Sequence, residues 1–376
     1  MKKIAFVLRA LPNPRMRKRI ELAKTISNAS VISWDMGFGE KKYHDEDVDF
    51  YPISIKALES DPLKRTFARF RFMYRTAQKL RQIKPDIIHV NLLEMLFVVS
   101  PFFLFKKDKP KIIYEVSDLH ELTMENHKNI KLKLIKTLLI IAEKFLCKYV
   151  DLLIVTSEKF YDVFYKAFMS KDKVLFMPNM PNIAAFKNYQ KKSKPQFAIG
   201  FVGAIRYLEQ MDILVKATDV IDVKVVFAGS TSAQKFEYFV EEHSTNENII
   251  FTGRFDYNKD ISTIYEGLDC VYSVYDADNA NVRIALPNKL YEAIYCELPI
   301  IVAKNTYLAE LVLDMGIGVA VAHDSVDELR DAIIRLKDDR DFYDEIVENC
   351  KKNKHMIKLE QYNNKLLNRI NKLFDN

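Results

Sequence analysis

Short, continuous runs of apolar residues recur along the chain, and a longer amphipathic stretch follows most of them. In the first half of the chain such runs begin at Lys3, Ala29, Asp86, Lys111, Asp151 and Lys173. Runs that are apolar at successive positions are typical of parallel strands covered on both faces. Their alternation with helical stretches predicts a doubly wound α/β sheet.

The pattern breaks over residues 182–196, which are polar and basic, and then it restarts. The later apolar runs begin at Phe197, Val223, Asn248, Cys270, Pro299 and Gly318. We therefore expect two tandem Rossmann-like α/β domains, residues 1–181 and 197–353, joined by a linker at 182–196 and facing a central cleft. Residues 354–376 predict a basic C-terminal helix that packs back toward the first domain.

The composition fits a two-domain globular protein, because 376 residues exceed one ordinary domain. The four cysteines are far apart and form no C-x-x-C pair, so we expect buried thiols in a reducing compartment and no zinc site. The apolar run at the N-terminus is too short for a signal peptide. Without a membrane-spanning apolar stretch, the sequence predicts a cytoplasmic protein.

One stretch, "LPNKLYEAIYCELPIIV" at residues 286–302, predicts a helix that begins near Pro287 or Asn288. A helix N-terminus with a nearby ammonium is suited to anions, and Lys289 could therefore meet a phosphate. Glu292 shares a face with Lys289 and could accept hydrogen bonds from two ribose hydroxyls. An ordinary surface ion pair would give the same pattern.

A second set of residues follows the first strand of the second half, in "GFVGAIRY". Gly203 would let the backbone approach a ligand, and Arg206 with Lys289 would form a diphosphate clamp. Arg206 alone would fit a surface loop equally well. No G-x-G-x-x-G and no P-loop is present, which disfavours dinucleotide and Walker-type binding.

The second half resembles the group 1 family of nucleotide-sugar glycosyltransferases, which adopt the two-domain GT-B fold. The resemblance is carried, in family order, by "FVGAIRYLEQMDILVKA", "VVFAGS", "NIIFTGRFDYNKDISTIYEGLDCVYSVY" and "LPNKLYEAIYCELPIIVAKN". The sequence resemblance covers most of residues 197–321. The first half resembles the family by its expected architecture alone. The resemblance implies donor binding by the second domain, with Glu292 on the ribose and Arg206 and Lys289 on the diphosphate; Gly203 and Asn288 complete the expected donor site.

The chain departs from the family pattern at three positions. Ile284 stands where many members have a glutamate, and Ala204 and Glu209 stand where many have a basic pair. The resemblance implies a hexosyltransferase-type enzyme with no cofactor and no essential metal, since the cations can offset the phosphate charge. A sugar-nucleotide epimerase and a non-catalytic GT-B subunit remain alternatives.

Polar residues follow the first-half run "KIIYEV", where relatives place groups near the transferred sugar. Asp118 could act as a general base on an acceptor hydroxyl, and His120 lies close behind it. If the reaction retains configuration, no strong base is required and Asp118 would instead hold a sugar hydroxyl. A loop carboxylate that caps the next helix is the alternative without a catalytic role.

The first 195 residues hold 37 Lys and Arg against 21 Asp and Glu. Much of this surplus lies in amphipathic stretches from Asp61 and His127 that interleave basic with apolar residues, a pattern typical of membrane-surface helices. We expect a peripheral enzyme on the cytoplasmic leaflet, with a lipid-linked or oligosaccharide acceptor in capsule or cell-wall assembly and no nucleic acid partner. Two core-packed helices with solvated faces are the alternative. The acceptor or membrane candidates are Arg15, Arg65, Arg69, Arg71 and Arg75.

Overall fold

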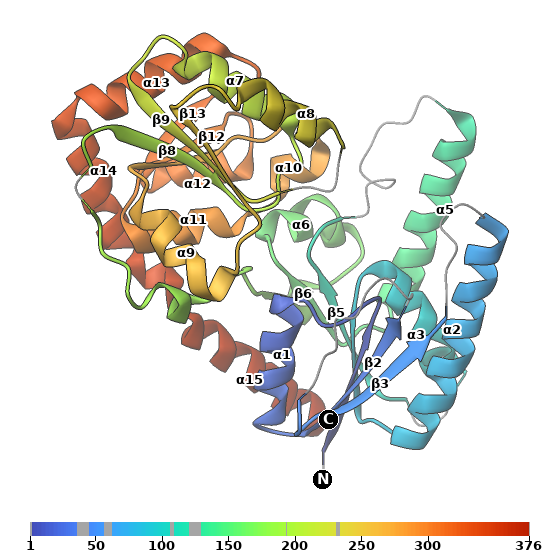
Figure 1. Ribbon diagram of the computed structural model, residues 1–376. Coiled ribbons are helices and arrows are strands. Elements are labelled where there is room, and N and C mark those ends of the chain that lie inside the picture. Colours follow the sequence, from blue (N-terminus) through green and yellow to red (C-terminus); the bar gives the residue numbers. More distant parts are fainter. Residues whose placement is uncertain are drawn as a thin grey trace. The chain divides into compact units, whose positions relative to one another are not determined.

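The computed structural model describes residues 2–35, 45–55, 62–105, 109–119, 129–192, 194–230 and 234–375. The chain divides into two compact units, and each is described separately below. The first unit contains residues 1–178 together with 359–376, and the second contains residues 179–358. Both are parallel α/β units, as the alternation of apolar runs and helical stretches predicts (Figure 1).

The first unit is built on a seven-stranded parallel sheet in the order β3-β2-β1-β4-β5-β6-β7. Its central strands are buried at nearly every position, because helices cover both faces. The strands are β1 (Lys3–Leu8), β2 (Asn28–Asp35), β3 (Asp49–Ser54), β4 (Ile87–Asn91), β5 (Lys111–Val116), β6 (Leu152–Val155) and β7 (Val174–Phe176).

Strand β3 was missed by the sequence analysis. It lies at the edge of the sheet, where only one side of the strand pairs and most side chains remain partly exposed. Its sequence, DFYPIS, is therefore not a continuous apolar run. Pro52 within it is tolerated because an edge strand does not need every N–H for the ladder.

The helices of the first unit divide between the two faces of the sheet. On one face α2 packs against α3, and α3 packs against α5; α1 contacts α15 elsewhere in the unit. The apolar residues Leu366 and Ile370 of α15 join the same core cluster as β1, which places the C-terminal helix in the first unit. The helices are α1 (Pro14–Lys24), α2 (Pro62–Ile83), α3 (Leu93–Leu104), α5 (Ile130–Cys147), α6 (Glu158–Val163) and α15 (Leu359–Asp375), with 3₁₀ turns η1 (Tyr165–Ala167) and η2 (Lys171–Lys173).

The second unit has a six-stranded parallel sheet in the order β10-β9-β8-β11-β12-β13. Its strands are β8 (Phe197–Val202), β9 (Val223–Ala228), β10 (Ile249–Gly253), β11 (Cys270–Ser273), β12 (Ile300–Ala303) and β13 (Gly318–Val321). The connecting helices are α7 (Leu208–Thr218), α8 (Gln234–His243), α9 (Tyr257–Glu266), α10 (Ala280–Ile284), α11 (Asn288–Cys296), α12 (Tyr307–Asp314), α13 (Val326–Asp338) and α14 (Arg340–Lys352), followed by the 3₁₀ turn η4 (Asn353–Ile357). All six strands correspond to apolar runs that the sequence analysis identified.

The stretch expected to be a linker instead contributes to the core of the second unit. It contains a 3₁₀ turn, η3 (Ile183–Phe186), and the ring of Phe186 is 1% exposed. That ring packs against the rings of Tyr257, Tyr265 and Tyr295, with centroids 5.4–6.4 Å away. A buried aromatic, together with hydrogen bonds from Tyr189 and Lys191 to the second unit, thus fixes a segment whose composition resembles a free linker.

Candidate functional site

The carboxyl ends of β8 and β9 in the second unit approach each other more closely than side chains would allow. The N–H of Gly203 donates to the carbonyl of Ala228 at 2.8 Å. A Cβ on Gly229 would lie 1.9 Å from the carbonyl oxygen of Gly203, and both glycines have positive φ, +128° and +141°. Glycine is therefore needed at both positions, and the backbone of Gly203 is left open beside the strand ends.

Lys289, the second residue of α11, reaches the same place. Its Nζ donates to the hydroxyl of Tyr275 at 2.9 Å and lies 4.0 Å from the centre of the Phe201 ring. A Cβ added to Gly203 would be 3.4 Å from this Nζ. The structure thus brings together two of the residues that the sequence analysis assigned to donor binding, and it adds Tyr275, which that analysis missed.

The ammonium of Lys289 is buried without a counter-ion. Its residue is 7% exposed, and no carboxylate contacts it within the described part of the chain. A buried charge is costly unless it is paired, and aromatic rings compensate only part of that cost. Together with the free N–H groups at the start of α11, this ammonium is suited to an anionic ligand.

Helix α11 begins at Asn288, as the sequence analysis predicted. Pro287 occupies the N-cap position, and no side chain caps this helix. The Oδ1 of Asn288 is buried and has no hydrogen-bond partner among the described residues. A buried polar atom of this kind commonly meets a water or a ligand, which keeps Asn288 in the candidate site.

Glu292 is fully engaged by protein groups. Its Oε1 accepts a hydrogen bond from Tyr257 at 2.7 Å, and its Oε2 accepts one from Tyr265 at 2.5 Å. Burial, and next the nearby Glu292 carboxylate, raise the pKa of both tyrosines well above the usual range, so both hydroxyls remain donors. Glu292 could bind ribose hydroxyls only with a lone pair that the tyrosines leave, or after one tyrosine moves away.

Arg206 lies in the loop after β8 and is exposed, with no hydrogen bond or ion pair to any described residue. The sequence analysis did not single out a second arginine, which follows another strand of the same sheet. Arg254 directly follows β10, and its Nε donates to the hydroxyl of Ser230, which follows β9, at 3.1 Å. Its position immediately after Gly253 at a strand end is the signal that would have identified it.

Among the described residues, one group has ligands suited to a metal ion. Asp276, Asp278 and His323 each place one ligand atom within 4.8 Å of the others. Asp276 and Asp278 belong to the loop after β11, where the carboxylates are solvated. Exposed acidic groups are common without a metal, and we assign no role to this group.

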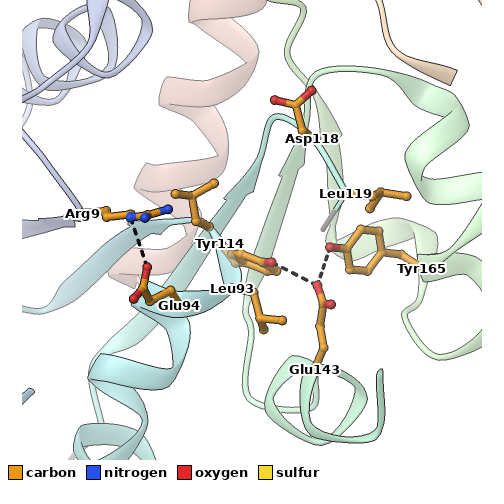
Figure 2. Close-up of a pocket in the computed structure, with 9 residues that line it drawn as sticks. Arg9, Leu93, Glu94, Tyr114, Asp118, Leu119, Glu143 and Tyr165 are labelled. Atoms are coloured by element: carbon orange, nitrogen blue, oxygen red, sulfur yellow. Dashed lines mark hydrogen bonds and ion pairs between the residues drawn. The ribbon is translucent and has the colours of Figure 1, made fainter. Parts of the chain in front are cut away.

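In the first unit, Asp118 lies just after β5 and is exposed. It lines a pocket with Tyr114, Glu143 and Tyr165 (Figure 2). His120, the second catalytic candidate, lies outside the described residues. Asp118 therefore stands at the carboxyl end of the sheet, where the sequence pattern predicted it.

Arg15 does not suit the membrane role for which it was a candidate. Its side chain is 14% exposed and forms an ion pair with the buried Glu115, which also binds Arg19 and His89. Burial opposes the ionisation of Glu115, but the charge of Arg19 and the hydrogen bond from His89 outweigh it and hold the pKa well below its usual range. Arg15 and His89 are therefore parts of a buried charge cluster.

Helix α2 carries the remaining basic candidates. Arg71 and Arg75 are exposed, and Arg69 pairs with Glu94 at 2.7 Å; the side chain of Arg65 lies outside the described part of the chain. Exposed aromatic residues alternate with these arginines: Phe67, Phe70 and Tyr74. Helix α5 likewise exposes Ile130, Leu134, Ile135, Leu138, Ile141 and Phe145. Neither of these helices, nor any other in the described ranges, is long and apolar enough to cross a membrane.

Comparisons with known proteins agree with this arrangement. Residues 182–353 match the family model "Glycosyl transferases group 1". The match covers most of the second unit, which contains Gly203 and Lys289, so this unit resembles the group 1 glycosyltransferases. It is also 25% identical over 262 residues to the succinoglycan biosynthesis protein ExoL of Rhizobium meliloti (strain 1021), a match that spans 65% of this chain and 62% of ExoL.

Solved structures share the fold over the full length. A sucrose-phosphate synthase from Thermosynechococcus elongatus is similar with a TM-score of 0.78 and 14% identity, covering 100% of both chains. HepE from Anabaena, solved in complex with UDP-glucose, is similar with a TM-score of 0.70 and 16% identity over 99% of this chain and 100% of HepE. The architecture is therefore that of GT-B glycosyltransferases, with two parallel α/β units and a C-terminal helix.

Proposed function

We propose that the protein transfers a sugar, of the hexose type, from a nucleoside-diphosphate donor to a hydroxyl group of a lipid-linked or oligosaccharide acceptor. The product would be part of a cell-surface polysaccharide, such as a capsule or cell-wall glycan. The role of ExoL in succinoglycan biosynthesis and the UDP-glucose bound to HepE support this class of reaction.

The observation that carries the proposal is the buried, uncompensated ammonium of Lys289 at the start of α11. A diphosphate would supply the missing negative charge and would accept from the free N–H groups of the helix. During transfer, negative charge accumulates on the departing diphosphate, so the same groups would stabilise the leaving group. Arg206, Gly203 and Asn288 complete the proposed donor site, and no essential metal is required.

The acceptor hydroxyl would attack the anomeric carbon as the bond to the diphosphate breaks. Its proton would pass to the carboxylate of Asp118. His120 remains a second candidate for this step. The position of Asp118 after β5, in the lining of a pocket that also includes Tyr114 and Glu143, supports its assignment as the general base.

The enzyme would be cytoplasmic and would bind the anionic inner face of the membrane, where it would meet its acceptor. Helix α2 contains no acidic residue, and the one acidic residue of α5, Glu143, is buried. The exposed apolar residues of both helices would enter the interface, and each nearby Lys or Arg would add about 1 kcal/mol. The basic candidates for this contact are Arg65, Arg69, Arg71 and Arg75.

Flotation with phosphatidylcholine vesicles, with and without phosphatidylserine, tests the membrane contact separately. We expect the wild-type protein to bind the anionic vesicles in a salt-sensitive way. A variant in which Leu134, Leu138 and Ile141 are changed to serine should lose this binding. Val220→Ser, at an exposed apolar residue of the second unit, is the control and should bind normally. Equal recovery with both vesicle types, or no flotation, would contradict this contact.

A non-catalytic subunit that keeps the fold is the second candidate. The specific observation in its favour is Glu292, both of whose carboxylate oxygens are already engaged by tyrosines. Such a subunit would bind a nucleotide weakly or not at all, and it would not turn over. A sugar-nucleotide epimerase would act without any acceptor.

Turnover distinguishes these functions. The protein would be incubated with UDP-glucose, UDP-galactose or GDP-mannose and a panel of octyl glycosides, and products would be detected by mass as glycosides enlarged by one hexose. We expect transfer that EDTA does not reduce and that Asp118→Asn lowers at least tenfold, while Asp162→Asn, at an exposed aspartate of α6, leaves it unchanged. An altered donor sugar without any enlarged glycoside would indicate an epimerase. No reaction with any donor, in protein shown to be folded, would favour the non-catalytic subunit.

A further inference from the structure

The first unit contains a small pocket at the carboxyl end of its sheet, where open α/β sheets bind ligands (Figure 2). Its volume is about 110 Å³, so at roughly 30 Å³ per water molecule it has room for part of one sugar unit. The lining residues come from β5, from the loops after β1, β4 and β5, and from α3, α5 and η1: Arg9, Leu92, Leu93, Glu94, Tyr114, Asp118, Leu119, Glu143 and Tyr165.

Glu143 is the unusual member of this lining. It is a carboxyl group on α5 that is 3% exposed, and no cation pairs with it among the described residues. Its Oε1 accepts hydrogen bonds from both Tyr114, at 3.0 Å, and Tyr165, at 2.7 Å. Burial raises the pKa of Glu143 despite the two tyrosine donors.

The second oxygen of Glu143 has no hydrogen-bond partner within the described part of the chain. This oxygen is not one of the fully buried atoms that lack a partner, and its residue lines the pocket, so it is open to water or to a ligand there. The buried hydroxyls of Tyr114 and Tyr165 account for Oε1 of this carboxyl group. They do not account for Oε2, which is left for a ligand in the pocket.

The rest of the lining indicates what that ligand is. Leu92, Leu93 and Leu119 offer apolar walls, whereas Arg9 and Glu94 form an ion pair at 3.3 Å on the rim. Walls of this kind suit the C–H face of a sugar, and carboxyl groups suit its hydroxyls. The ion pair leaves little net charge to attract a phosphate or another strongly charged group.

We infer that this pocket binds one sugar unit of the acceptor and that Glu143 recognises a hydroxyl group of that unit through Oε2. The inference rests on the proposed transfer function and deepens it by assigning the acceptor a saccharide and a specificity-determining residue. Helix α5 then has two roles: its exposed apolar residues face outward, and its last turns present Glu143 to the pocket. A saccharide carried on a lipid would suit both.

The test is saturation-transfer NMR with the methyl β-glycosides of glucose, galactose, mannose and N-acetylglucosamine. We expect at least one glycoside to bind the wild-type protein. Glu143→Leu should weaken its binding tenfold or more, because it removes both oxygens. Glu143→Gln should bind within about threefold of wild type, because the amide oxygen can still accept from both tyrosines and its NH₂ can donate to a hydroxyl.

Control measurements keep the result interpretable. Circular dichroism and UDP binding, a property of the second unit, should be unchanged in each variant. If Glu143→Leu does not fold, a triple variant that also carries Tyr114→Phe and Tyr165→Phe is used in its place. In that variant the two buried tyrosine hydroxyls are removed together with their acceptor, so none is left unpaired. Tenfold weakening in both the Gln and Leu variants would support the contact and identify Oε2 as a hydrogen-bond acceptor.

Two results would overturn the inference. One is wild-type protein that binds none of the four glycosides, and the other is a folded Glu143→Leu variant that binds them as wild type does. Failure of the proposed function is distinguishable from either, because it would be seen as no UDP binding and no transfer, whatever the glycosides do.

Discussion

Each unit contains a buried glutamate on a helix that is bound by two tyrosines, but the two clusters differ in how the hydrogen bonds are distributed. In the first unit both Tyr114 and Tyr165 donate to one oxygen of Glu143, a residue that lines a pocket, and its other oxygen has no donor among the described residues. In the second unit Tyr257 and Tyr265 each donate to a different oxygen of Glu292.

The difference teaches that a residue type and its burial do not define a role. Glu143 retains a carboxyl oxygen for a ligand, whereas both oxygens of Glu292 help to hold α9 against α11. In the second unit the buried residue without a counter-ion among the described residues is Lys289, whose ammonium donates to a tyrosine hydroxyl. The sites that we propose therefore lie where the described residues leave a charge without a counter-ion or a carboxyl oxygen without a donor, and not at every buried charge.

The largest effect is expected at Glu115, a third buried glutamate, whose partners are charged rather than phenolic. Glu115→Gln removes the negative charge between Arg19 and Arg15 and should lower the free energy of unfolding by about 3–5 kcal/mol at neutral pH. Urea denaturation would measure the loss. Glu209→Gln, at an exposed glutamate of α7, is the matched control and should change little.

The pH dependence of that loss has a definite sign. Since the pKa of Glu115 is lowered on folding, its contribution is present above the usual pKa of about 4.5 and is lost as the pH falls toward the native value. The gap between wild type and Glu115→Gln should therefore narrow on acidification below that point. A gap that widens on acidification would contradict the charged assignment.

Lys289→Met comes next in size and acts on binding. Losing a charge-assisted contact should cost about 1.5–3 kcal/mol of nucleoside-diphosphate affinity. The same change should raise the melting temperature in the absence of ligand, because it removes a buried charge that has no counter-ion. Calorimetry and thermal unfolding measure the two effects, and a fall in both affinity and melting temperature would contradict our account of Lys289.

Glutamine substitutions compare the two tyrosine clusters directly. In the wild type a tyrosine hydroxyl donates to each oxygen of Glu292. In Glu292→Gln one of these hydroxyls would face the amide NH₂, which cannot accept, so we expect the free energy of unfolding to fall by about 1–3 kcal/mol. In Glu143→Gln the amide oxygen can accept from both tyrosines, so the loss should stay below about 0.5 kcal/mol. Urea denaturation of both variants provides the test, and losses of equal size would remove the distinction between the clusters.

The smallest effect is the pH dependence of the Glu143 comparison. Because the pKa of Glu143 is raised on folding, the wild type should lose stability relative to Glu143→Gln as the pH rises above about 4.5 and through the native pKa. Below that point the difference should be constant. Denaturation at a series of pH values would measure it, and a wild type that gains stability with rising pH relative to the variant would contradict a pKa of Glu143 that burial raises.

Much of the fold follows from local patterns. The buried strands, the helix at Asn288 and the approach of Gly203 to a cation were predictable, because apolar periodicity, helix start signals and glycines at strand ends are encoded in neighbouring residues. Edge strand β3 was not predictable in this way, since half-exposed residues carry no continuous apolar run. Phe186 likewise gave no sign that it would anchor the expected linker.

The roles of individual charged residues depended on distant partners. Glu292 meets Tyr257 and Tyr265, which lie on another helix, and Arg15 meets Glu115 on a strand far along the chain. The spacing of a motif identifies which side chains share a face, but it does not show which other elements pack against that face. The family resemblance rests on short sequence motifs. Such motifs identified the second unit, but they carry no information about contacts between distant elements.

The central claim is that the second unit binds a nucleoside diphosphate through Lys289. Isothermal titration calorimetry with UDP, GDP and dTDP on wild type, Lys289→Met and Lys216→Met tests it most directly; Lys216 is an exposed lysine of α7 paired with Asp212. We predict that one nucleotide binds the wild type and the Lys216 control alike and binds Lys289→Met at least tenfold more weakly. Wild-type protein that binds none of the three, or a Lys289→Met variant that binds as tightly as wild type, would contradict the account.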